Sequence, residues 1–199
     1  ITATSVMGVM MSVVIVILSL YEMHTRATHR HSFLTGIFKL SRSHWGMVFA
    51  HLGVAMTVFG IAMSHNFSIE KDVRMREGDS VQILDYNFTF KGLKITDGAN
   101  YQGGTADIEI TRNGKQEAIL HAEKRFYNVS KMGMTEAAID WGFTRDLYAA
   151  LGEQLDDGSW GLRLYYKPFI RWIWLGGLFM ALGGLLCMLD KRYRIRVKE

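Results

Sequence analysis

The chain has 199 residues, 49% of them hydrophobic, with 23 Lys and Arg against 19 Asp and Glu. The apolar residues gather in three runs, each long enough at ~1.5 Å per residue to cross the ~30 Å hydrocarbon layer, which excludes a single soluble domain. The net charge of +4 is split between two separate short segments, so no stripe for nucleic acid is expected.

The first run predicts a transmembrane helix over residues 1–21. Its central sequence, MGVMMSVVIVILSL, carries no charge. The run begins at once with Ile1, which is no initiator methionine, and its positive flank follows it, the reverse of a secretory signal peptide. We therefore interpret the chain as a piece of a longer membrane protein that begins just before or inside a transmembrane helix.

A loop over residues 22–43 and a tail over residues 190–199 are both basic. Short basic segments beside transmembrane helices mark the cytoplasmic side, so both are expected inside and residues 66–168 outside. The loop also holds three histidines: His24, His29 and His31. They lack a fixed helical or CxxC-like spacing, which favours a solvated loop facing lipid headgroups over a metal site.

The uncharged sequence HWGMVFAHLGVAMTVFGIAMSH predicts a second transmembrane helix over residues 44–65. His51 lies seven residues into it, ~10 Å below the level of His44. A titratable side chain is costly at that depth, so function is its default interpretation, and neutral imidazole is a common ligand for haem iron. The alternative is a histidine hydrogen-bonded to a neighbouring helix. His44 and His65 share its face, because each step of seven rotates only about 20°, but they mark the two ends.

Residues 66–168 predict a small β-rich domain with thirteen Lys and Arg against sixteen Asp and Glu. Alternation predicts strands in VQILDYNFTFKGLKI, GTADIEITR and AILHAEKRFYNV, separated by the turns DGANYQGG and NGK. The sequence MTEAAIDWGFTRDLYAALGEQL predicts a partly helical insertion, and WGLRLYYK predicts a return to strand. We expect an antiparallel barrel or sandwich in which His121, on a strand, is structural.

A third transmembrane helix is predicted over residues 169–189, preceded by Pro168, whose missing N–H costs nothing there. Arg171 lies among aromatic residues of the kind that anchor helices at the headgroup level. A basic residue on the outer side departs from the usual bias, so it either meets an anionic group or reaches out to water. The single cysteine, Cys187, can form no disulfide within the chain and is expected to pack between helices.

Three stretches carry a family resemblance: HWGMVFAHLGVAMTVFG, MTEAAID…RDLYAALGE and LRLYYKPFIRWIWLGGLFMALGG. They resemble the C-terminal part of the CcmF family, the membrane haem lyase component of bacterial cytochrome c maturation. The resemblance runs over essentially the whole chain, and the YYKPFIRWIW block followed by GG is its most specific piece. Family members are longer and carry a tryptophan-rich periplasmic segment that this sequence lacks. Related proteins for nitrite-reductase cytochromes share the architecture, so the subfamily stays open.

The resemblance implies that His51 matches one axial ligand of a transmembrane haem b, with the second ligand on a helix upstream of Ile1. It implies a multi-pass protein of the bacterial inner membrane whose β domain is periplasmic. Electrons from quinol would pass toward haem that the chaperone CcmE delivers for attachment to apocytochrome c. With one cysteine here, thiol reduction would belong to partners such as CcmH, and this segment alone is not expected to be catalytic.

Two classes of function follow from these observations. The first is haem handling in cytochrome c assembly, with the helical segment 135–155 as a docking surface for CcmH or apocytochrome c. In that case Arg171 is expected to meet a haem propionate or a lipid headgroup. The second is a non-enzymatic membrane receptor or assembly adaptor that displays a periplasmic β domain. A b-type absorption spectrum would distinguish the first from the second.

Overall fold

The computed structural model describes residues 2–29, 32–130 and 132–190. Contacts divide the chain into a helical unit, formed by the residues up to Phe67 and from Phe169 onward, and a β unit over Ser68–Pro168. Of the basic tail predicted over residues 190–199, residues 191–199 lie outside the described residues, as do Arg30 and His31 of the loop.

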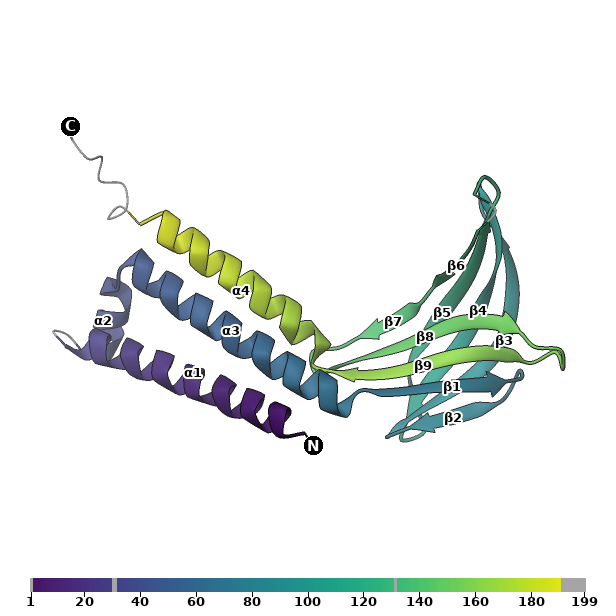
Figure 1. Ribbon diagram of the computed structural model, residues 1–199, viewed down its shortest axis with the longest axis horizontal. Coiled ribbons are helices and arrows are strands. Elements are labelled where there is room, and N and C mark those ends of the chain that lie inside the picture. Colours follow the sequence, from purple (N-terminus) through teal and green to yellow (C-terminus); the bar gives the residue numbers. More distant parts are fainter. Residues whose placement is uncertain (1, 30–31, 131, 191–199) are drawn as a thin grey trace. The chain divides into compact units, whose positions relative to one another are not determined.

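Among its described residues, the helical unit contains four helices (Figure 1): α1 (Ala3–Thr28), α2 (Phe33–Lys39), α3 (Arg42–Phe67) and α4 (Ile170–Met188). In the described part of the chain, α1, α3 and α4 are long and apolar enough to cross a membrane. The prediction of three transmembrane helices with an inserted β-rich domain is confirmed. The predicted loop over residues 22–43 is largely helical, because α1 continues to Thr28 and α2 follows.

A salt bridge explains part of this extension of α1 beyond its apolar run. Arg26 Nε lies 2.7 Å from Glu22 Oε1, one helical turn away, and such pairs support an exposed helix end. No proline or glycine follows Tyr21 before Gly36 to end the helix earlier. A loop is predicted from residue 22 because the apolar run ends there, but the helix continues as a polar helix to Thr28.

Helix α3 packs against both α1 and α4 (Figure 1). Toward α4 it presents glycines spaced by seven: Gly46, Gly53 and Gly60. A Cβ added at Gly53 would stand 2.5 Å from the carbonyl oxygen of Gly176 on α4, so the two backbones touch. Small residues that allow this approach are the usual basis of helix packing in lipid. Lipid tails are as apolar as the side chains, so burying apolar side chains between helices gives little free energy there.

Toward α1, helix α3 presents Ala55 and Ala62. On α1, Ser12 Oγ donates a hydrogen bond of 2.8 Å to the carbonyl oxygen of Ala55, and Gly8 lies against Ala62. The buried serines of α1 are also spaced by seven: Ser5, Ser12 and Ser19. Hydroxyl-to-backbone bonds of this kind join helices where water is absent.

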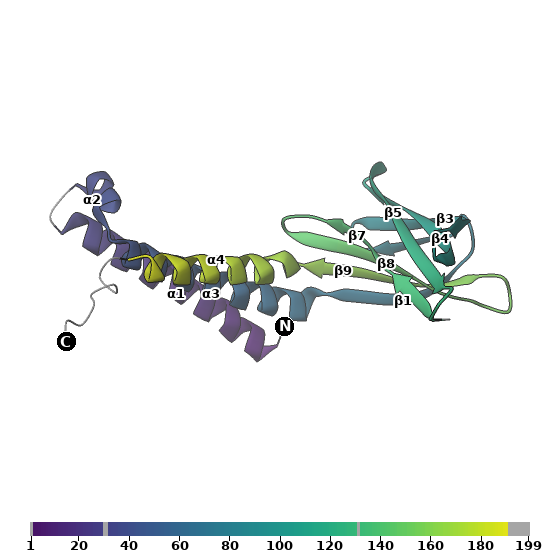
Figure 2. The same ribbon diagram turned by 90° about the horizontal axis from the view of Figure 1, so that it is seen from above.

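The β unit is a sandwich of two antiparallel sheets (Figure 2). One sheet has the order β1-β9-β8-β7, formed by β1 (Ile69–Met75), β9 (Trp160–Pro168), β8 (Arg145–Gln154) and β7 (Ala138–Trp141). The other has the order β2-β3-β4-β5-β6, formed by β2 (Ser80–Ile83), β3 (Tyr86–Asp97), β4 (Tyr101–Arg112), β5 (Lys115–Tyr127) and β6 (Gly133–Glu136).

The core between the sheets follows from alternation along the strands. In β4, Ile108 and Ile110 are fully buried while Asp107 and Glu109 face outward. The opposite sheet contributes Leu147 and Leu164, which are also fully buried. Because successive side chains point to opposite faces, this pattern specifies which face of each sheet meets the other.

The helical insertion predicted within residues 135–155 is wrong: the segment forms β6, β7 and β8. Alanine and leucine favour helix locally, which explains the prediction. Their spacing decides otherwise, because Leu147, Ala149 and Leu151 alternate along β8 and are 0–1% exposed in the core. Burial of one face of a strand outweighs helix propensity here. A docking surface on a helix is therefore excluded for this segment.

Candidate functional site

His51 lies in the middle of α3 and its side chain is exposed. Its Nδ1 lies 2.8 Å from the carbonyl oxygen of Met47, one turn earlier in the helix. A carbonyl oxygen can only accept, so Nδ1 donates this hydrogen bond and Nε2 is the ring nitrogen left available to a ligand. Metal-binding histidines are commonly fixed in this way, with one ring nitrogen bonded to a backbone carbonyl and the other on the metal.

The face of α3 that carries His51 is apolar and exposed. Positions 51, 54, 58, 61 and 65 follow the 3-and-4 spacing that places side chains on one side of a helix. Val54 and Ile61 on this face are 37% and 51% exposed, in contrast to the glycines toward α4 and the alanines toward α1. His51 is thus exposed on the side of α3 away from the glycine contact with α4, on a face that borders α1 further along the helix, at Val58.

The three histidines of α3 have different surroundings, although the spacing by seven placed them on one face. His44 is only 7% exposed, whereas His51 and His65 are exposed. Within the described chain, Nε2 of His44 has no hydrogen-bond partner. Close packing separates His44 from anything as large as a porphyrin, so His51 is the accessible histidine inside the apolar part of α3.

His51 fits one axial position of a haem. A single imidazole provides one axial bond to an iron whose equatorial ligands come from the porphyrin, and the neutral Nε2 is the donor that haem proteins use most. The apolar side chains around it, Val54 among them, suit a macrocycle in a lipid-depth site. No charged side chain occurs in α3 between His44 and His65 to oppose this.

Arg171 does not lie near His51. It is exposed in the first turn of α4, where α4 meets α3 at the level of Gly60 through Phe169 and Ile173. Gly60 is nine residues beyond His51, about 13 Å along the helix. The structure therefore brings Arg171 to one end of the helix pair and His51 to its interior.

Aromatic rings gather beside Arg171. The ring of Phe169 lies 5.2 Å from that of Phe59 and 5.3 Å from that of Trp172, both in edge-to-face contact. Trp174, two residues after Trp172, is 75% exposed. Tryptophan at a helix end is typical of the headgroup level, as the sequence predicted for this region.

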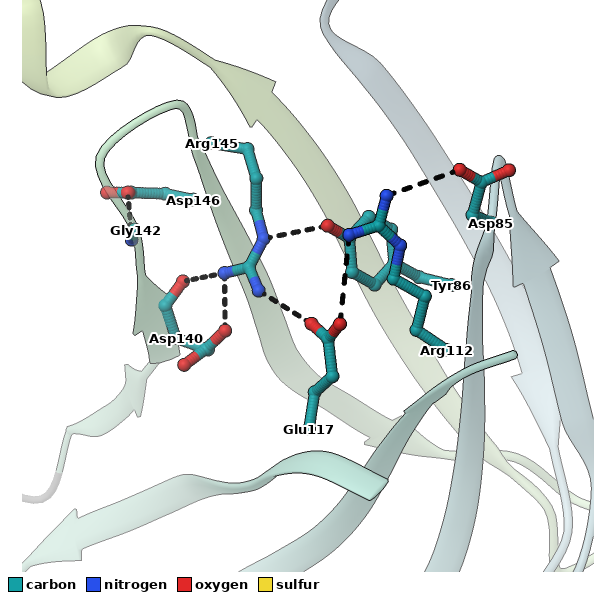
Figure 3. A network of polar contacts seen from close by, with 8 residues as sticks. All are labelled: Asp85, Tyr86, Arg112, Glu117, Asp140, Gly142, Arg145 and Asp146. Carbon is teal, nitrogen blue, oxygen red and sulfur yellow. Dashed lines mark hydrogen bonds and ion pairs between the residues drawn. The ribbon is translucent and has the colours of Figure 1, made fainter. Parts of the chain in front are cut away.

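A polar network lies at one end of the β unit (Figure 3). Arg145, at the start of β8 and with its side chain 15% exposed, donates from Nη2 to Glu117 over 2.9 Å and from Nε to the hydroxyl of Tyr86 over 3.1 Å. Its Nη1 contacts the carboxylate of Asp140. Arg112 stacks on the other side of Tyr86, 5.2 Å from the ring centre. The network joins the two sheets, since Tyr86 and Glu117 belong to one and Arg145 to the other.

His121 lies on the outer face of β5, as expected for a strand residue. Its Nδ1 donates to Asp107 over 2.7 Å, and Lys94 donates to the other carboxylate oxygen over 2.6 Å. The bond from Lys94, opposed by partial burial and aided by the bond from His121, lowers the pKa of the Asp107 carboxyl. These contacts fit the structural role predicted for His121.

The sequence prediction missed the turn between β7 and β8. Trp141 and Phe143 flank Gly142 there, and each aromatic side chain is 69% exposed. A glycine between two aromatic residues within DWGFTRD is a turn signal, but the expectation of a helix concealed it.

The β unit matches a known protein family. Residues 66–168, which include the whole β unit, match a family model described as the CcmF C-terminal beta-sandwich. The chain belongs to the CcmF family. The resemblance read from the sequence is thereby confirmed.

Relatives match the membrane helices as well as the β unit. The cytochrome c-type biogenesis proteins CcmF of Haemophilus influenzae and Escherichia coli are 66% and 55% identical to this chain over 197 residues, 99% of its length. Those residues make up 30% and 29% of the two relatives, so the chain spans about three tenths of their length. The NrfE protein of Haemophilus influenzae is 39% identical over 150 residues, 75% of the chain and 24% of that relative.

A solved structure has the same fold. The chain named Cytochrome c Heme Lyase CcmF superposes with a TM-score of 0.65 at 18% sequence identity, covering 89% of this chain and 34% of that one. This chain therefore shares its fold with the matching part of that structure.

Proposed function

We propose that this chain is the part of a cytochrome c haem lyase that supplies, through His51, one axial ligand of a transmembrane haem b. The observation that carries the proposal is the orientation of His51. Its Nδ1 is bonded to the carbonyl of Met47, its Nε2 is left available to a ligand, and its side chain is exposed on an uncharged stretch of α3. Membership of the CcmF family supports haem as the group that this face receives.

Helix α3 has three tasks in this proposal: it holds the imidazole in one tautomer, aims Nε2, and keeps the surroundings apolar. Helix α4 contains no histidine, and the one histidine of α1, His24, lies beyond the apolar run of residues 1–21, so the second imidazole is assigned to the remainder of the protein, outside residues 1–199. When bound with both axial positions filled, haem b supplies electron transfer rather than ligand activation. The electrons would come from quinol and serve haem brought by the chaperone CcmE, in the inner membrane.

The β unit is proposed as the periplasmic docking domain for CcmH and apocytochrome c. A groove of about 540 Å³ over β8 and β9 supports this role, with small residues in its lining and charged ones beside them. The small residues are Ala150, Gly152 and Gly161, and the charged ones are Asp72, Arg74 and Arg163. Thiol reduction of apocytochrome c is assigned to CcmH, because Cys187 is a single thiol inside α4.

A chimera tests this function. The matching segment of the Escherichia coli CcmF is replaced by this chain, and reduced-minus-oxidised spectra and cytochrome c yield are recorded. The chimera is expected to show a low-spin b-type spectrum and to restore cytochrome c. This chain alone, with His51 as its one histidine deep inside an apolar helix, is expected to insert into the membrane and be nearly colourless.

A second chimera separates the two roles. Residues 68–168 are replaced by a short linker, which can join α3 to α4 because Ile69 pairs with Tyr166 at the adjacent ends of β1 and β9. It is expected to keep the b-type spectrum and lose cytochrome c yield. A folded but colourless intact chimera would instead support the alternative function, a membrane receptor or adaptor that displays the β unit.

Arg171 is proposed to meet an anionic group at the outer surface, a haem propionate or a lipid headgroup. The planar guanidinium binds a carboxylate or phosphate through two parallel hydrogen bonds, which the point charge of lysine cannot do. Arg171→Lys in the chimera is therefore expected to lower cytochrome c yield while protein abundance stays the same. Full yield in this variant would show that Arg171 only extends toward water.

A further inference from the structure

The β7–β8 turn lies at the end of its sheet where the chain enters α4. Arg145, the first residue of β8, pairs with Pro168, and Asp146 pairs with Lys167. Helix α4 begins at Ile170, so two peptide units, at most about 7 Å of chain, separate the Pro168 pair from that helix. This proximity follows from strand pairing and chain connectivity alone.

This turn exposes large aromatic side chains. Trp141 and Phe143 are each 69% exposed, and Ile139 on the same edge strand is 44% exposed. On the adjacent outer face of the sheet, the ammonium group of Lys167 lies 5.0 Å from the ring centre of Tyr165 and 5.7 Å from that of Tyr148. The surface thus combines exposed apolar rings with a cation at the border of the sheet.

Hydrogen bonds fix the conformation of the turn (Figure 3). The amide of Gly142 donates to Asp146 Oδ1 over 3.2 Å, and Asp146 is only 3% exposed. On the other side, Arg145 donates to the carbonyl oxygen of Asp140 over 3.3 Å and contacts its carboxylate. The backbone that presents Trp141 and Phe143 is therefore held in place before any partner arrives, which reduces the entropy cost of binding.

We infer that the β7–β8 turn is a membrane-interface anchor, in which Trp141 and Phe143 enter the boundary between lipid headgroups and acyl chains. We take lipid as the occupant for the following reason. The turn ends at Arg145, which pairs with Pro168, and Pro168 lies two residues before α4, an apolar helix of membrane-spanning length. Amphipathic aromatic rings concentrate at that boundary, and Lys167 would lie at the level of the phosphates.

A second exposed apolar surface of the β unit has a different position. Val129, Met132 and Met134, at the β5–β6 turn, are 93%, 68% and 54% exposed. From that turn the chain runs through β6 and β7 toward Trp141, so this surface lies at the opposite end from the β7–β8 turn. It carries no tryptophan and no comparable link to a helix, and it provides the control for the experiment.

Depth-dependent fluorescence quenching tests the inference on the complete chain in vesicles of phosphatidylcholine and phosphatidylglycerol. In a Cys187→Ala background, an environment-sensitive dye is attached at Phe143→Cys, and in separate samples at Asp156→Cys and Val129→Cys. Asp156 is exposed in the β8–β9 turn, at the far end of the same sheet, and Val129 is a matched apolar position.

Nitroxide-labelled lipids are expected to quench the dye at position 143 several-fold more than the dye at position 156 or 129, with a blue-shifted emission at 143 only. Thr144→Cys, exposed in the same turn, provides a second site if labelling at 143 disturbs the fold. Equal quenching at all sites, or none at 143 and 144, would overturn the inference. The haem spectrum plays no part in this readout, so the result is independent of the proposed function.

Discussion

Replacing His51 by alanine in the chimera is expected to abolish the b-type spectrum and most of the cytochrome c yield. If His51 is the proposed axial ligand, the variant would remove the bond from Nε2 to the iron and leave the iron with one protein ligand. The fold of α3 should not change, because His51 is exposed and its ring bonds to the carbonyl oxygen of Met47 on its own helix. Loss of haem at normal protein abundance is therefore the predicted result.

His65→Ala is the matched control for His51→Ala. His65 is exposed on the same face of the same helix, fourteen residues further, where no ligand is proposed. It should keep the spectrum and the yield. His51→Gly with added imidazole should recover part of the spectrum, since a free imidazole can occupy the vacated position. A normal low-spin spectrum in His51→Ala would show that another residue binds the iron.

Gly176→Val is expected to separate α3 from α4. A Cβ at Gly176 would stand 2.3 Å from Thr57 Oγ1, 2.5 Å from the carbonyl oxygen of Gly53 and 2.8 Å from the amide nitrogen of Thr57. Two of these atoms are backbone of the facing helix and cannot move aside. Forced overpacking of this kind costs ~1–3 kcal/mol or more. The melting temperature in detergent and the abundance in the membrane should both fall.

Gly177→Val tests whether the effect comes from the helix contact. The next residue of the same helix has open space where its Cβ would be, with nothing within 4 Å. Because glycine is itself a poor helix former, by about 1 kcal/mol relative to alanine, the change should be close to neutral. Equal destabilisation by the two variants would mean that the glycine contact between α3 and α4 does not hold the pair together.

Much of the fold could be predicted because its signals are local. Runs without charge identify α1, α3 and α4, and alternation identifies β3, β4 and β5. The segment now seen as β7 and β8 could not be predicted in the same way. Its alanines and leucines suit a helix, and only the opposite sheet, built from residues far away in the chain, makes burial of Leu147 and Leu151 decisive.

The candidate site shows the same division. The depth of His51 and its reach to Met47, four residues earlier, both follow from helix geometry. The burial of His44 does not, because it depends on which neighbouring helix covers that end of α3. The network around Arg145 depends on contacts with Tyr86 and Glu117 across two sheets, and no sequence spacing announces it.

The two stripes of small residues on α3 also fix the rotation of this helix about its own axis. Gly53 faces α4 and Ala55 faces α1, two residues and about 200° of rotation apart. Any turn of α3 about its own axis would move Gly53 off Gly176 and draw Ala55 away from Ser12 at the same time. Contacts with α1 and α4 therefore fix the rotation of α3 about its axis, and with it the direction in which the His51 side chain leaves the helix.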